Sequence, residues 1–165
     1  MAKVSNQELI EKLTARFNDQ LSSVTEPFGL LTFETKREDI TEVLSYLKNE
    51  LQFIHLTDIT AVHYPELETP FAVVYHLHNL AENKRIRIKT FVTLGEPAVS
   101  TVTDLFSSAN WMERETYDFY GILFEGHPNL KRILNVEYMD FFPMRKEYPL
   151  EDPTREDKDD RYFGR

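Results

Sequence analysis

Residues 84–94, KRIRIKTFVTL, alternate basic and apolar side chains, and this pattern constrains the fold more than any other feature of the chain. A period of two is typical of a strand with one face in the core and the other in water. Two runs rich in β-branched and aromatic residues precede it, FIHLTDITAVHY at 53–64 and PFAVVYHLHNL at 70–80. Because only a short polar turn at 81–83 separates the last two runs, they predict an antiparallel hairpin.

Three helices are predicted around these strands. Ser5 and Glu8 mark a capping box, and apolar residues follow it at helical spacing: Leu9, Ile10, Leu13 and Phe17. After a predicted strand at 29–35, a second capping box at 35–38 precedes another apolar stripe: Ile40, Val43, Leu44, Leu47 and Leu51. The third helix is expected to begin between residues 100 and 104 and to run to Tyr120, where Gly121 ends it.

The composition excludes several classes of function. The 165 residues suffice for one domain with its own core. A formal net charge of -9 disfavours nonspecific binding to nucleic acid or to anionic lipid. The absence of cysteine excludes disulfides, thiolate zinc sites and cysteine-held iron–sulfur clusters. The sequence has neither a signal-type apolar run at its start nor the roughly 20 apolar residues that span a bilayer.

The last residues, 145–165, differ in kind from the rest. More than half of them are charged and few are aliphatic, so they bury too little apolar surface to order themselves. Tyr148, Leu150, Tyr162 and Phe163 are spaced along the segment. We therefore expect either an arm that becomes ordered on a partner or a disordered tail.

The window at 111–134, WMERETYDFYGILFEGHPNLKRIL, holds the densest set of candidate site residues. Glu115 and Asp118 share one face of a helix, whereas Glu113 lies about 200° from Glu115. This spacing matches no metal motif, and Arg114 would neutralise the acids, so an ion-pair network at a helix end is the favoured interpretation. His127 sits in a Gly-His-Pro turn, where a structural role is favoured over metal binding.

Other candidate sites are weaker. His76 and His78 would point to one face of a strand, a spacing that some metal sites use, but no third ligand is identifiable. The five glycines form neither a phosphate-binding loop nor a nucleophile elbow. The basic alternation at 84–89 is similar to an RNA-binding sheet, although the net charge favours an acidic protein surface as its partner.

Large aromatic residues alternate with charges in the 111–134 window, a composition enriched at interface hot spots. We therefore predict a docking segment made of a helix end, a tight turn and a short basic helix around Lys131 and Arg132. The window also resembles a family signature through Glu113-Arg114-Glu115, Asp118, Gly121-Ile122, Gly126-His127-Pro128 and Leu130-Lys131-Arg132-Ile133-Leu134. The family is the C subunit of respiratory complex I, the 30 kDa subunit of NADH-quinone oxidoreductase. Residues 143–150 continue the resemblance more weakly, because Phe141-Phe142 stand where the family has Gly-His and Glu147 replaces Asp.

The resemblance implies an α+β fold with two layers, in which a mixed, largely antiparallel sheet carries helices on one face. It implies a noncatalytic subunit without cofactor or metal, in the peripheral arm on the cytoplasmic side of the bacterial inner membrane. Such a subunit packs on the D subunit, which carries the quinone site, beside the B and I subunits, and it is attached to the membrane only through the complex. Two alternatives stay open: the equivalent subunit of a complex I-related membrane-bound hydrogenase, and a stand-alone metal-dependent hydrolase using His76, His78 and His127.

We accordingly expect a domain at 1–144 that contains the docking signature, and an extended charged arm at 145–165 that wraps a partner subunit. Arg114→Ala is expected to lower assembly of the complex by breaking a buried ion pair. The residues expected to form the structural and interface network are Trp111, Glu113, Arg114, Glu115, Asp118, Gly121, Gly126, His127, Pro128, Arg132, Pro143, Arg145 and Lys146.

Overall fold

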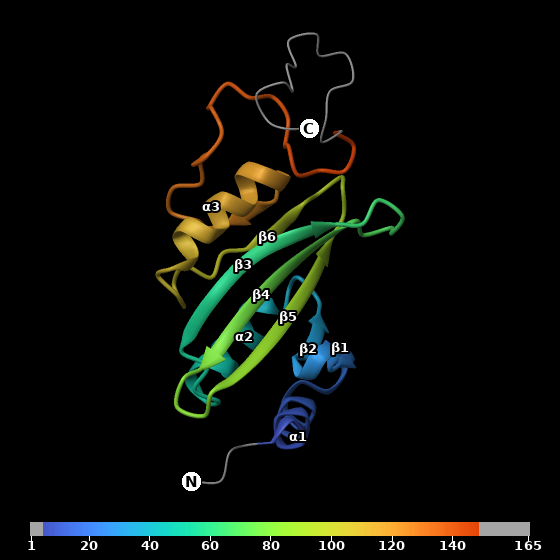
Figure 1. Ribbon diagram of the computed structural model, residues 1–165, viewed down its shortest axis with the longest axis vertical. Helices are drawn as coiled ribbons and strands as arrows, with labels where there is room; N and C mark the ends of the chain where they lie inside the picture. The colour runs from blue at the N-terminus through green and yellow to red at the C-terminus, as the bar shows by residue number, and fades with distance from the viewer. Residues whose placement is uncertain (1–4, 149–165) are drawn as a thin grey trace, which may run out of the picture.

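The computed structural model describes residues 5–148, and the predicted arm lies almost entirely outside them. Five strands form the main sheet in the order β1-β2-β5-β4-β3 (Figure 1). Their bounds are Leu21–Thr25 for β1, Leu31–Thr35 for β2, His55–His63 for β3, Phe71–Asn79 for β4 and Lys84–Val92 for β5. Only β2 and β5 run parallel, so the sheet is mixed and largely antiparallel as predicted.

The β4–β5 hairpin confirms the prediction from alternation. Its register pairs Asn79 with Lys84 across the turn and Phe71 with Val92 at the far end. Ile86, Ile88 and the other even-numbered positions that follow them in β5 are buried, whereas Arg85 is exposed and Arg87 and Lys89 are half-buried on the opposite face. One face of the sheet therefore lies in the core, and the other faces solvent.

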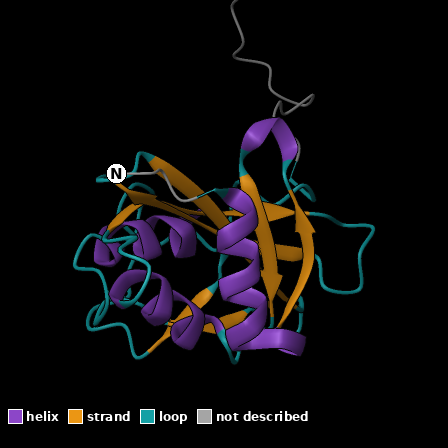
Figure 2. Ribbon diagram, turned by 90° about the horizontal axis from the view of Figure 1, so that it is seen from below, coloured by secondary structure: helices purple, strands orange, loops and turns teal. Residues whose placement is uncertain are grey.

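The helices cover the apolar face of the sheet. They are α1 at Asn6–Phe17, α2 at Ile40–Asn49 and α3 at Ala109–Tyr120, and their buried side chains join those of the sheet in one core cluster. In Figure 1, α2 is visible behind the strands and α3 lies along β3; Figure 2 shows the helices from below. The predicted α+β, two-layer fold is thus confirmed. Among residues 5–148, no helix is long and apolar enough to cross a membrane.

The helix starts differ from the predictions in two places. The Ser5 capping box is present, with the hydroxyl accepting from the Glu8 N–H and the Glu8 carboxylate accepting from the Ser5 N–H. The second capping box is wrong: Asp39 is the N-cap of α2 without a side-chain bond, and the Thr35 hydroxyl donates to the carbonyl of Gln20 instead. The sequence does not separate these cases because both carry the same capping pattern.

The third helix begins later than predicted. Residues 98–100 form β6, Ala98–Ser100, which pairs in parallel with β7, Leu123–Glu125. Turns follow to residue 108, and α3 begins only at Ala109. The spacing of apolar residues predicts the early start, but Val102 and Phe106 are buried from a loop that precedes the helix. Gly121 ends α3 at φ +73°, as predicted.

Candidate functional site

The candidate site is a loop, residues 126–148, that returns across α3 without forming a helix or strand of its own. The predicted short basic helix around Lys131 and Arg132 is therefore wrong. Backbone N–H groups that a helix would use internally are bound here by a side chain of α3. The structure thus replaces a regular element by a loop fastened to a helix through a few polar residues.

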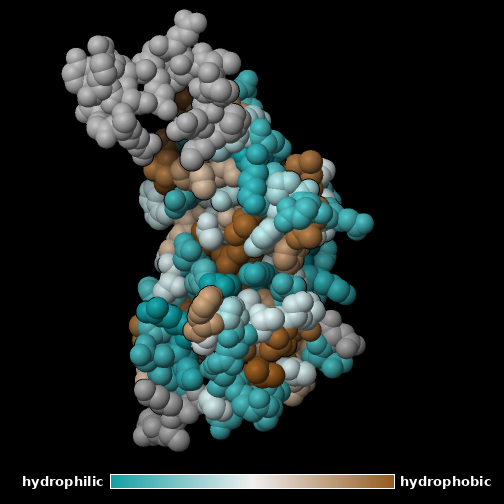
Figure 3. Space-filling view, turned by 45° about the vertical axis from the view of Figure 1, so that its right-hand side comes forward, coloured by the Kyte–Doolittle hydropathy of each residue, from teal (hydrophilic) through white to brown (hydrophobic). Residues whose placement is uncertain are grey.

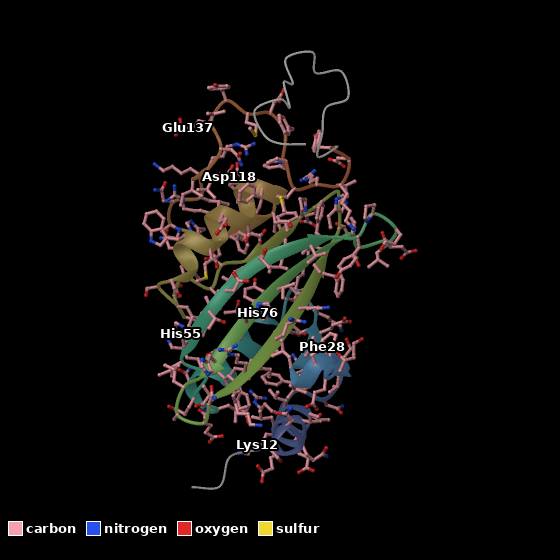
Figure 4. All side chains as sticks on the ribbon, in the orientation of Figure 1. Lys12, Phe28, His55, His76, Asp118 and Glu137 are labelled. Atoms are coloured by element: carbon pink, nitrogen blue, oxygen red, sulfur yellow. The ribbon has the colours of Figure 1, made fainter. Side chains whose placement is uncertain are left out.

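Asp118 is the centre of this attachment. Its side chain is fully buried, and one carboxylate oxygen accepts from the N–H groups of residues 133, 134 and 135 at 2.8–3.0 Å. The other oxygen accepts from Arg132 at 2.8 Å and from the side-chain amide of Asn135 at 3.1 Å. Figure 4 labels Asp118 on α3, next to the loop that carries Glu137.

These bonds decide the charge of Asp118. Desolvation by burial raises the pKa of its carboxyl, but the bonds from Asn135, Arg132, Leu134 and Ile133 together outweigh it and leave the pKa well below the usual value. The carboxylate is therefore ionised and saturated with donors. Such a group holds structure together and is not available as a general base.

Arg132 extends the attachment to the far part of the loop. One terminal nitrogen donates to the carbonyl and the carboxylate of Asp118, at 2.9 and 2.8 Å. The other donates to the carbonyls of Met139 and Phe141, at 2.8 and 2.9 Å. Its guanidinium also lies 4.9 Å from the ring centroid of Phe142. A single buried side chain thus fixes three separate points of backbone.

Arg114 and Arg145 fix the two flanks. Arg114 donates to the carbonyls of residues 131 and 132, at 3.1 and 3.2 Å, and its guanidinium lies 5.1 Å from the Trp111 ring. The predicted neutralisation of neighbouring acids by Arg114 is wrong, because its bonds go to backbone oxygens. Arg145 donates to the carbonyl of Tyr120 at 2.7 Å and lies between Phe71 and Phe142.

Gly121 permits this close packing. A Cβ there would lie 2.5 Å from a ring carbon of Phe142 and 2.6 Å from a terminal nitrogen of Arg145. The residue also needs its positive φ to end the helix. Phe142 therefore packs directly over the helix end.

Glu113 faces the interior on the other side of α3. It is fully buried, and its carboxylate accepts from the N–H of Val102 at 2.7 Å and from the hydroxyl of Thr101 at 2.5 Å. Burial raises its pKa to about 7, and these two bonds only partly oppose that effect. Within residues 5–148 it forms no ion pair, so the predicted ion-pair network is confined to Asp118 and Arg132.

The ring of His127 in the Gly-His-Pro turn is hydrogen-bonded through both of its nitrogens. The Nδ1 atom of His127 accepts from the N–H of Asn129 at 3.0 Å, so Nε2 carries the proton and donates to the carbonyl of Asn110. Gly126 has φ +83°, and a Cβ there would lie 3.3 Å from a methyl of Thr101. The turn therefore closes the start of the loop onto α3.

Three expected residues lie outside the contacts of Asp118 and Arg132. Glu115 is exposed, so it does not share the surroundings of Asp118. Pro143 lies half-buried in a turn. The backbone N–H of Lys146 donates to Nδ1 of the buried His63 at 3.0 Å, which ties the end of the loop to β3.

The loop presents apolar side chains to solvent. We call the following set the apolar loop surface, with exposed fractions between 36% and 87%: Leu134, Val136, Tyr138, Phe141 and Met144. Trp111 on α3 is 61% exposed. In Figure 3, hydrophobic surface gathers next to the grey residues at the upper end of the molecule.

The histidines proposed as metal ligands are not brought together. His76 contacts Arg87 and Asp58, His78 bonds to Asn83, and His127 bonds within its turn. Within the described part of the chain, no group of three His, Asp or Glu residues is placed to hold a metal ion. The metal-dependent hydrolase alternative therefore has no site in residues 5–148.

Several residues of the attachment were not predicted from the sequence. Thr101 and Val102 hold Glu113, Asn110 accepts from His127, and Asn135 binds Asp118. Only Asn135 could have been found from the sequence, because it directly follows the signature at 111–134. The polar side chains of α3 and of the loop therefore bond to one another and to the loop backbone, and their effect is to hold the loop in position.

Comparison with known proteins gives the same family by sequence and by structure. The family model described as "Respiratory-chain NADH dehydrogenase, 30 Kd subunit" matches residues 33–154. The C subunit of NADH-quinone oxidoreductase from Citrifermentans bemidjiense is 43% identical over 151 residues, covering 92% of this chain and 94% of that protein. The corresponding subunit of Geobacter sulfurreducens is 38% identical over 152 residues, with the same coverage of each chain.

Two solved structures are similar to the chain. A trypsin-resistant fragment (1–134) of Nqo5 superposes with a TM-score of 0.67 at 33% identity, covering 75% of this chain and 98% of the fragment. A chain of a membrane-bound sulfane sulfur reductase, an archaeal respiratory membrane complex, superposes with a TM-score of 0.76 at 26% identity. That match covers 87% of this chain and 85% of the other.

Proposed function

The chain belongs to the family of the 30 kDa subunit of respiratory-chain NADH dehydrogenase, and from this premise we propose that it is a noncatalytic subunit of complex I. It carries no redox cofactor, and it supports electron transfer from NADH to quinone by holding neighbouring subunits in place. Its place is the peripheral arm on the cytoplasmic side of the bacterial inner membrane. Its main contact is the quinone-site subunit, the D subunit of the complex, beside the B and I subunits.

One observation carries the docking role: hydrogen bonds fasten the loop that bears the apolar loop surface to α3. The backbone of residues 131–141 is fixed by Asp118, Arg114 and Arg132 before any partner is bound. A preformed surface loses little conformational entropy on association, which favours tight binding. Asp118, Arg114 and Arg132 therefore position the apolar loop surface, although they are not part of that surface.

The composition of the surface supports a protein partner. Leu134, Val136 and Met144 supply aliphatic contact area, while Tyr138 and Phe141 supply aromatic anchors. Contiguous exposed apolar groups on an isolated chain mark sites of association, and aromatic residues are enriched at interface hot spots. We assign this surface to contact with the quinone-site subunit.

The proposed boundary between domain and arm lies at the end of this surface. Arg145 and Lys146 are tied to Tyr120 and His63, so the chain leaves the domain beside the apolar loop surface. An arm beginning there would continue over the same partner. Residues 149–165, which would form most of that arm, lie outside the described part of the chain.

A second candidate is the equivalent subunit of a related membrane complex. The similarity to a chain of the archaeal sulfane sulfur reductase complex favours it, because that match covers most of both chains. The same fold and loop would then dock on a complex with a different catalytic module, such as a membrane-bound hydrogenase. Identification of the co-purified catalytic subunits separates this candidate from complex I.

The test is affinity purification of the tagged chain from its own detergent-solubilised membranes, in wild-type form and with two matched substitutions. Leu134→Glu places a charge in the apolar loop surface, whereas Leu80→Glu places one at the β4–β5 turn, where Leu80 is 57% exposed. We expect the quinone-site subunit and the B and I subunits with the wild type and Leu80→Glu, and loss of the quinone-site subunit with Leu134→Glu.

Recovery of the wild-type chain alone would refute membership of a complex. Equal recovery of the quinone-site subunit with both variants would refute the assignment of the surface. Hydrogenase or sulfur reductase subunits in place of the NADH-oxidising ones would select the second candidate.

A further inference from the structure

The solvent face of the main sheet is a separate feature that the docking role does not use. The register of β3, β4 and β5 places His55 opposite His78, Asp58 opposite His76, and both His76 and His78 opposite arginines of β5. Arg85 pairs with His78, and Arg87 pairs with His76. Figure 4 shows His55 and His76 along the sheet, away from Asp118 and the loop.

A chain of contacts across three strands orients Arg87. Its Nε atom donates to Nε2 of His76 at 2.8 Å, and Nδ1 of His76 lies 3.5 Å from a carboxylate oxygen of Asp58. Burial, and next the charge of Arg87, lower the pKa of His76, while Asp58 acts in the opposite direction. The ring is thus an acceptor for Arg87, which is held by its inner nitrogen alone.

The outward-facing donors of Arg85, Arg87 and Lys89 have no bonding partner among the described residues. Within residues 5–148, the terminal nitrogens of Arg87 and all the side-chain donors of Arg85 and Lys89 lack a hydrogen-bond partner or an ion pair. Arg85 and Arg87 are two residues apart on one strand, so their Cα atoms are spaced by about 7 Å and their side chains leave the same face. Each presents a planar pair of donors that fits a carboxylate.

This face of the sheet is positively charged, whereas the whole chain is negatively charged. The whole chain has a formal net charge of -9, yet β5 carries three cations in a row on the solvent side. Of the acids on the same face, Asp58 is next to His76, and Glu34 lies opposite Lys89. In the register of β2 with β5, Thr32 lies opposite Arg87, so the β2 partner of this arginine is not an acid.

We propose that this face, centred on Arg85, Arg87 and Lys89, is a second protein interface that binds acidic side chains of another subunit of the same complex. The partner is a protein because the formal net charge of -9 opposes binding to a phosphate backbone. The inference rests on the proposed membership of a complex, and it is independent of the apolar loop surface.

Carbodiimide crosslinking of the purified complex tests the proposal, because the reagent joins an amine to a carboxylate only where the two are in contact. We expect Lys89 to be crosslinked to an aspartate or glutamate of another subunit, identified by mass spectrometry. R85E/R87E should abolish that crosslink and lower the salt concentration at which the chain leaves the complex by twofold or more.

The control is K12E/K36E, which changes the net charge equally at exposed lysines outside this face. Absence of a Lys89 crosslink in a complex that contains the chain would overturn the proposal and leave the proposed function intact. Equal salt release of the two double variants would overturn it as well. Purification of the chain without any subunit would overturn both, and a Lys89 contact with RNA would replace the protein partner.

Discussion

The buried carboxyl of Glu113 makes the stability of the fold depend on pH in an unusual direction. Its pKa rises from 4.5 to about 7 in the folded chain, mainly because burial disfavours the charged form. The folded chain therefore binds more protons than the unfolded chain between these two pH values. Its free energy of unfolding must fall as the pH rises through this window, because folding then requires an anion in the core.

The magnitude follows from the same two values. A difference of about 2.5 pH units at 1.36 kcal/mol each gives about 3 kcal/mol, which is the penalty at pH above 7 relative to pH below 4.5. Glu113→Gln removes the charge and keeps an oxygen that accepts from the N–H of Val102. We expect this substitution to leave stability nearly unchanged at pH 5 and to raise it by about 2–3 kcal/mol at pH 8.

The assay is urea unfolding of both chains at half-unit steps from pH 5 to pH 8, followed by tryptophan fluorescence. The comparison of the two chains cancels every titration that they share. Glu115→Gln, on the exposed side of α3, is the matched control and should change stability by less than about 0.5 kcal/mol at every pH. An effect of Glu113→Gln that is the same at pH 5 and pH 8 would refute the argument from burial.

Three further substitutions or conditions test the attachment of the loop. Asp118→Ala leaves a buried guanidinium without its partner and should lower the free energy of unfolding by about 3–5 kcal/mol in urea titration, whereas Glu115→Ala should change it by less than about 0.5 kcal/mol. Gly121→Ala forces a methyl group into an aromatic ring and should cost about 1–3 kcal/mol, measured by thermal unfolding; an unchanged midpoint would contradict the packing. Burial lowers the pKa of His63 below its usual 6.5, so the folded chain holds the neutral ring. The free energy of unfolding is therefore undiminished by His63 above pH 6.5, and it decreases as the pH falls below that value. The protection of the Lys146 amide, which donates to Nδ1 of His63, should therefore fall from pH 7.5 to pH 5.5, so that its exchange slows by less than the intrinsic rate does. Exchange that slows in proportion to the intrinsic rate would refute this coupling.

The elements with strong periodicity were predicted from the sequence, and those fixed by distant contacts were not. Alternation in residues 84–94 indicated β5 and its hairpin partner, because the burial of one sheet face imposes that pattern directly. The strands β6 and β7 are three residues each, too short for any period to show. The late start of α3 depends on this pairing, which joins residues 98–100 to 123–125.

The site was predicted as a group of residues, but its geometry was not. Position along the chain placed Asp118 and Arg132 in one window, and their pairing is present. The partners of Arg114 are backbone carbonyls, which carry no signal in a sequence. The three N–H groups bound by Asp118 carry no signal either, and the segment around Lys131 and Arg132 was predicted as a short helix.

The bonds of Asp118 also bear on how the chain folds. They join residues separated by only 14–17 positions, and closing so short a loop costs little chain entropy. The loop can therefore form as soon as α3 exists, without waiting for the pairing of the long strands. A partner that recognises Leu134 and its neighbours would thereby select chains in which this helix has already folded.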